Sequence, residues 1–175
     1  MVDAEPIELE GKQWHGDRLG PAQFAPNSSL VDLALTECDV VGVLAEKARL
    51  ERVSITNSRL RGTTWAGGVV RHVTLDNVTG TDVSFRFSSL RSVTIRDAQI
   101  PELDFTDVEF DEVRLERCVL PGAVFDHARV KSLRIEGCDL AGATGVINLR
   151  GASMDFDDVL SVAPGLAREI GILIE

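Results

Sequence analysis

The sequence predicts an all-β fold in which the chain turns a corner every five residues and stacks four-sided coils into a quadrilateral β-helix. Three observations predict it: a five-residue apolar period, a second uncharged column two residues earlier, and similar segments every twenty residues. A short α-helical cap is expected at the C-terminal end. The 175 residues suit one such unit. We therefore predict a β-helix over residues 1–154 and a cap with a dimerisation tail over residues 155–175.

The five-residue period is clearest between Leu30 and Leu140. Of the 23 positions spaced five apart in this span, 21 are large and apolar, and the exceptions are Ala45 and Gly80. The column two residues earlier holds mostly small residues, and neither column contains a charged residue. A period of five fits neither a continuous helix nor a continuous strand. It predicts a chain that sends two side chains of each five inward and three outward.

The twenty-residue period indicates that four five-residue sides make one coil. Trp65, Phe85, Phe105 and Phe125 are twenty residues apart and predict an interior aromatic column. Stacked coils satisfy one another's backbone groups, so stability is mostly between neighbours and both ends need caps. We expect Ala45 to compensate for the volume of Trp65, and Gly80 to leave a small void or mark a bulge.

Before Leu30 the period continues with a shifted phase. Leu9, Trp14, Leu19 and Phe24 keep the five-residue spacing, and one extra residue resets the frame. After Gly145 the phase shifts again. We expect bulges or short loops at both places, with the β-helix continuing through them.

The C-terminal segment predicts a cap. Acids at the start suit a helix N-terminus, an apolar stripe follows, and Pro164 is expected to split the segment into two short helices. Gly171 is expected to end the second helix, and residues 172–174 to add a strand. The segment either seals the last coil or also pairs two copies of the chain. The candidate cap or dimer residues are Val159, Leu160, Ala163, Leu166, Ile170, Ile172 and Ile174.

Charge and composition exclude several classes of function. The net charge of −10 argues against direct nucleic-acid binding, because phosphate contacts require a basic surface. No run of eighteen apolar residues is present, so no membrane span is expected. The acidic first ten residues do not resemble a secretory signal, and three cysteines do not make a disulfide framework. A cytoplasmic protein is predicted.

Catalytic chemistry is not expected. The three histidines, His15, His72 and His127, are scattered and pair with no nucleophile at a recognisable spacing. There is no phosphate-binding glycine loop and no metal-ligand spacing among the cysteines. We predict no enzyme activity, no cofactor and no metal, with the cysteines as small buried thiols.

The outward columns carry all the charges of residues 30–140, and two groups stand out among them. An acidic face is the candidate partner-binding surface, since spaced carboxylates on a rod can imitate phosphates; the alternative is a solvated surface that blocks association. A basic group follows residue 46, and it counts against a uniform imitation of DNA. Phe87 also falls in an outward column, as either a contact residue or an isolated exposed one. The acidic face comprises Glu102, Asp104, Asp107, Glu109, Asp111, Glu112 and Glu116.

The repeat resembles the pentapeptide repeat family, whose unit is described as Ala-Asp/Asn-Leu-x-x. Cys138-Asp139-Leu140, Ala123-Val124-Phe125 and Cys118-Val119-Leu120 carry the resemblance, which covers about residues 5–154. Valine often replaces the small first residue, and Asp or Asn is often missing. Valine nevertheless prefers extended backbone.

The resemblance implies a right-handed quadrilateral β-helix and a noncatalytic protein-interaction module. One branch of the family contains quinolone-resistance proteins that resemble DNA and bind DNA gyrase, and the tail after residue 156 is similar to their dimerising tails. It implies a homodimer and gyrase as a candidate partner. The alternatives are an orphan scaffold without DNA mimicry and, remotely, a β-helix acyltransferase-type enzyme, whose repeat would be six residues rather than five.

Overall fold

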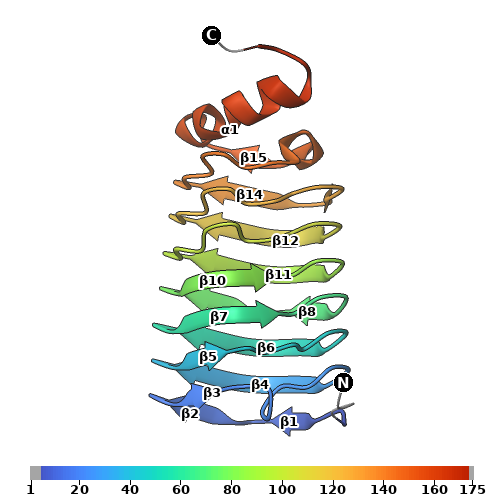
Figure 1. Cartoon of the computed structure of the whole chain (residues 1–175), viewed down its shortest axis with the longest axis vertical. Helices are drawn as coiled ribbons and strands as arrows, with labels where there is room; N and C mark the ends of the chain where they lie inside the picture. The colour runs from blue at the N-terminus through green and yellow to red at the C-terminus, as the bar shows by residue number, and fades with distance from the viewer. Residues whose placement is uncertain (1–4, 174–175) are drawn as a thin grey trace.

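The computed structural model describes residues 5–173 as a rod of stacked coils, with the N-terminal coil at one end and a helix across the other (Figure 1). All strand pairs are parallel, as expected when each coil lies directly on the one before. The predicted all-β quadrilateral β-helix with a C-terminal helical cap is confirmed.

Strands on two adjacent sides of the rod form the larger sheet. Its strands are β1 (Glu8–Glu10), β2 (Gln13–His15), β4 (Ser29–Thr36), β6 (Arg49–Thr56), β8 (Val69–Arg71), β9 (Thr74–Asp76), β11 (Ser89–Arg96), β12 (Glu109–Glu116), β13 (Arg129–Val130), β14 (Leu133–Glu136) and β15 (Ser153–Met154). The smaller sheet contains β3 (Arg18–Leu19), β5 (Asp39–Val41), β7 (Arg59–Thr64) and β10 (Thr79–Ser84).

The register of the strand pairs shows how many residues make one coil. In the pair of β11 and β12, Leu90 lies opposite Phe110 and Ile95 opposite Leu115, twenty residues apart. At the N-terminal end Leu9 pairs with Leu30, an offset of twenty-one, which confirms the extra residue there. Near the C-terminal end the pairing of β14 with β15 has an offset of nineteen. Both predicted phase shifts therefore leave the coil stacking intact.

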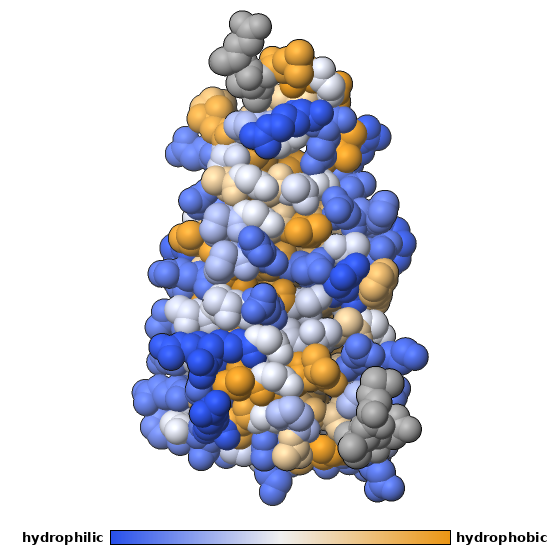
Figure 2. All heavy atoms as spheres, in the orientation of Figure 1, coloured by the Kyte–Doolittle hydropathy of each residue, from blue (hydrophilic) through white to orange (hydrophobic). Residues whose placement is uncertain are grey.

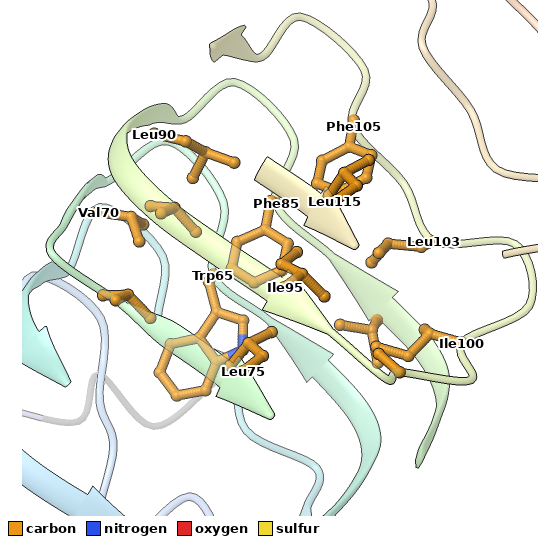
Figure 3. Packing of buried hydrophobic residues seen from close by; sticks show 14 of the residues in the cluster. Trp65, Val70, Leu75, Phe85, Leu90, Ile95, Ile100, Leu103, Phe105 and Leu115 are labelled. Carbon is orange, nitrogen blue, oxygen red and sulfur yellow. The ribbon is translucent and has the colours of Figure 1, made fainter. Parts of the chain in front are cut away.

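The two inward columns form one continuous apolar core (Figure 3). Phe105 lies between Phe85 and Phe125, with ring centroids 6.1 and 5.5 Å away in near-parallel stacks. Trp65 instead contacts Phe24, edge to face at 5.6 Å, on the far side of the small Ala45. The predicted volume compensation is confirmed.

Gly80 leaves no void and marks no bulge, so that prediction is wrong. Its Cα pairs in register with that of Leu60 in the ladder of β7 and β10. A Cβ on Gly80 would lie 2.8 Å from the Val83 side chain and 3.2 Å from Ile100. The neighbouring side chains have closed over the position, as expected in a close-packed interior.

The C-terminal end begins with a short 3-10 helix, η1 (Val146–Leu149), and continues into a single helix, α1 (Phe156–Glu169). Pro164 lies inside α1, so the predicted split into two helices is wrong. The helix ends as expected: Gly171 has a left-handed φ of 83°, and the Gly171 and Ile172 amides donate to the carbonyls of Arg168 and Ala167. Residues 172–173 form no strand, and Ile174 lies outside the described residues.

Candidate functional site

The acidic residues predicted as a face lie around one coil. Because each side of the rod takes five residues, the seven residues from Glu102 to Glu116 occupy three consecutive sides and the corners between them. One flat surface cannot contact all seven, and in this respect the prediction of a single face is wrong. We call these seven residues the acidic belt.

Most of the acidic belt is paired within the chain. Lys131 donates to Glu109, Arg86 lies 3.4 Å from Asp104, and Arg91 lies 3.8 Å from Asp111. The rest of the belt, apart from Glu102, also has partners: His127 lies 3.8 Å from Asp107, Arg114 lies 3.9 Å from Glu116, and Ser92 Oγ donates to Glu112 at 2.6 Å. Glu102 forms no ion pair with any residue that the structure describes. The belt therefore presents less free negative charge than its composition suggests.

Several arginines are paired in the same way across adjacent coils. Arg52 forms two hydrogen bonds with Asp32, at 2.5 and 2.9 Å, and Arg117 forms two with Asp97, at 2.8 and 2.7 Å. In each pair the partners are twenty residues apart and so lie on adjacent coils. The Arg52 and Arg117 guanidinium groups hold the pKa values of Asp32 and Asp97 below the usual value. Lys131 lowers the pKa of Glu109 likewise.

The side of α1 that faces the last coil is polar. Asp158 accepts hydrogen bonds from the backbone amides of Gly137 and Cys138, at 2.9 and 2.7 Å. Glu169 accepts from the amides of Val146 and Ile147, and Ser161 Oγ lies 3.4 Å from the amide of Leu140. These side chains replace the carbonyl groups that a further coil would supply. Val162 is the one large apolar side chain of α1 that is buried.

The opposite side of α1 is apolar and uncovered, and hydrophobic side chains gather over the helix at this end of the rod (Figure 2). The predicted cap or dimer residues that lie within the described range 5–173 face away from the last coil, so the alternative in which these residues seal it is wrong. Leu160 is 54% exposed and Phe156 76% exposed. The residues recur three or four apart, which places them along one side of the helix. This exposed face of α1 comprises Phe156, Val159, Leu160, Ala163, Leu166 and Ile170, with Ile172 just beyond the helix.

Asp158, Ser161 and Glu169 were missed as cap residues, although the sequence carries a signal for Asp158. Cys118, Cys138 and Asp158 are each twenty residues apart, and the Cys118 amide likewise donates to Cys138 Sγ, at 3.4 Å. Asp158 thus continues an inward column after the strands have ended. The contacts of Ser161 and Glu169 depend on the orientation of the helix, which the repeat does not specify.

The cysteines are buried, free thiols. The neighbouring Cys138 and burial together raise the pKa of Cys118. Among residues 5–173, no group of three or more His, Cys, Asp or Glu side chains is arranged to hold a metal ion. No helix in the same range is long and apolar enough to cross a membrane.

The coils define the class of the molecule, a parallel β-solenoid with a five-residue repeat. Residues 104–143 match the family model for pentapeptide repeats in eight copies. Residues 104–143 therefore carry pentapeptide repeats, as the resemblance predicted for this part of the chain.

Solved structures with a similar coil arrangement include QnrB1, described as a plasmid-mediated fluoroquinolone resistance protein. The similarity has a TM-score of 0.46 at 11% identity and covers 97% of this chain and 98% of that one. Rfr23, a pentapeptide repeat protein from the cyanobacterium Cyanothece 51142, has a TM-score of 0.45 at 12% identity, covering 62% of this chain and 86% of its own. Comparison with curated protein sequences gives no match.

Proposed function

We propose that this chain is a noncatalytic protein-interaction module that associates as a homodimer through α1 and presents its coil sides to a protein partner. The observation that carries the proposal is the exposed apolar face of α1. A helix that only sealed the last coil would turn its apolar side inward. Here the polar side chains contact the coil, and the apolar ones point away from it.

A second copy of the chain is the proposed occupant of this face. The face lies at the end of the rod, where two copies can meet tail to tail around a two-fold axis with the same residues on both sides. Burying Leu160 and its apolar neighbours would remove large side chains from water, which favours association. In this arrangement α1 acts both as a cap and as the dimer contact.

DNA gyrase is the partner to test first. The support is the resemblance to the quinolone-resistance branch, the net charge of −10, and carboxylates distributed around a rod. A gyrase supercoiling assay with the protein in excess tests it: inhibition or protection from a quinolone is expected. In the double variant Asp107→Lys/Glu112→Lys the effect should be lost, while Glu8→Lys/Glu10→Lys, with the same change in net charge, should keep it. An assay in which even the wild type has no effect at high excess would contradict the gyrase proposal.

A scaffold without DNA mimicry is the second candidate, and the internal ion pairs favour it. Where Arg and Asp of adjacent coils neutralise each other, the surface lacks the continuous negative potential of a duplex. This candidate predicts no effect on gyrase and a dimer that forms all the same. The supercoiling assay therefore distinguishes the two candidates.

A further inference from the structure

One side of the rod is hollowed into a groove of about 840 Å³ that spans several coils. Its floor is made of small side chains, namely Thr64, Ala66, Gly67 and Ser84. On the adjacent coils, the residues at the equivalent positions have longer side chains, and these side chains form the rims of the groove. The groove lies on the side of the coils, far along the chain from α1.

Phe87 forms one rim and is unusual for its position. Its side chain is 58% exposed, and its φ of 60° is in the left-handed region. Every other non-glycine residue with positive φ in the described part of the chain is polar or charged. A bulky apolar residue is disfavoured both by that backbone conformation and by contact with water. The ring is not held by the core, so neither packing nor corner geometry accounts for it.

The opposite rim is acidic. Asp82 and Glu102 occupy the same corner column on adjacent coils, and neither forms an ion pair with a residue in the described range 5–173. Glu46 also lines the groove. Of the basic residues there, Arg86 is already engaged: it lies 3.4 Å from Asp104, and its guanidinium lies 5.4 Å from the centre of the Phe87 ring. The lining contains four acids and two bases. It therefore complements a positive ligand.

We infer that the groove binds a basic segment of a protein partner, with an arginine or lysine side chain placed between the Phe87 ring and the carboxylates of Asp82 and Glu102. The aromatic face attracts a cation, and the carboxylates neutralise it. Arg86 shows that the ring accepts a guanidinium at this rim. Ala66 and Gly67 keep the floor low for the backbone of an extended peptide. That backbone would run beside the Lys47 stem, which lies 3.5 Å from the position of a Cβ on Gly67. The negative lining disfavours a nucleic acid.

This inference rests on the proposed interaction function but uses residues outside α1. The probe is a fluorescein-labelled nine-residue peptide in which two arginines flank a leucine. The control is a matched peptide with glutamine in place of both arginines. Binding is followed by fluorescence anisotropy at two salt concentrations. The wild type should bind the arginine peptide and not the glutamine peptide, and more weakly at high salt.

Variants locate the binding. Phe87→Asn places a residue that occupies the equivalent corners at positions 57 and 77, and Asp82→Asn/Glu102→Gln removes two charges without changing shape. Each should weaken binding at least tenfold, while Glu8→Gln/Glu10→Gln, with the same loss of charge, should bind as the wild type does. Thermal melting of each variant confirms that it is folded.

Equal affinity in all variants would show that the peptide binds outside the groove, and equal weakening in the Glu8→Gln/Glu10→Gln control would show general charge attraction. Either result would overturn the inference. If Phe87→Asn instead dissociated a dimer of the chain, the occupant would be a second copy, and the inference would also fall. Failure of the gyrase assay leaves the groove intact. Peptide binding that is lost in the groove variants, in a chain that stays monomeric, would refute the α1 dimer and keep the groove.

Discussion

Asp158 lies twenty residues after Cys138, and its Oδ1 accepts a hydrogen bond from the Cys138 amide at 2.7 Å. Its other oxygen accepts from the Gly137 amide at 2.9 Å. One carboxylate on a helix thus takes the place of the backbone that the next coil would have supplied. The β-helix ends here because the sequence replaces a coil by a helix with acceptors in the matching register.

Replacing Asp158 by alanine is expected to destabilise the protein by about 1–3 kcal/mol, because two amides lose their acceptor. Asp157→Ala is the control: that side chain is exposed on the same turn, and the substitution changes charge and helix propensity in the same way. Urea unfolding followed by circular dichroism measures the difference. Equal stability of the two variants would show that the carboxylate does not cap the coil.

Thr63 is expected to be a weak point of the core. Its hydroxyl is buried without a hydrogen-bond partner, between Val43 and Val83 in the same inward column. Thr63→Val keeps the shape and removes the unsatisfied group, so it should stabilise the fold by about 1 kcal/mol. The neighbouring Thr64→Val, on the outer surface, should change little. A Tm of Thr63→Val below the wild type would contradict this account of the site.

Gly80→Ala is expected to destabilise the protein by about 1–3 kcal/mol through overpacking, because the new methyl would lie 2.8 Å from Val83. The matched control is Gly20→Ala, whose Cβ would meet only the Val41 carbonyl, at 3.5 Å. Differential scanning calorimetry of the two variants gives the comparison. A neutral Gly80→Ala would mean that the interior accommodates the methyl, contrary to the packing described.

Stability should fall as the solution becomes acidic. The pKa values of Asp32 and Asp97 are lowered in the folded state by Arg52 and Arg117, so the folded state binds these protons less readily than the unfolded chain does. Their contribution is fully present above the unfolded pKa and is lost as pH falls through the folded value. Urea unfolding between pH 7 and pH 3 measures it. The Asp32→Asn/Asp97→Asn variant should show a shallower loss, and an unchanged slope would contradict the role of these pairs.

Spacing alone predicts most of the fold. The recurrence of uncharged residues indicates the inward columns, the corner every five residues and both phase shifts. Charged side chains avoid the inward positions because burial would remove them from solvent. The packing around Gly80 could not be predicted, because it depends on how the Val83 and Ile100 side chains fill the space beside it. The continuity of α1 through Pro164 could not be predicted either, because contacts on both sides of the proline hold the helix in place.

The candidate sites were predictable in composition but not in geometry. The acidic residues were recognised, yet their spread over three sides follows only when the coil length is applied to each residue. Phe87 was recognised as outward, but the groove beside it depends on small residues such as Gly67 from a neighbouring coil. The candidate cap or dimer residues were identified by their apolar character, while the side of α1 on which they lie is decided by Asp158 and Glu169.

The exposed face of α1 is the main support for the proposed function, and sedimentation equilibrium tests its role directly. The wild type is expected to be a dimer, and Leu160→Glu a folded monomer. Leu44→Glu replaces an equally exposed leucine on the coils, 56% against 54%, and should remain a dimer. A wild type that stays monomeric at every concentration, or a Leu160→Glu variant that still forms dimers, would contradict the proposed role of α1.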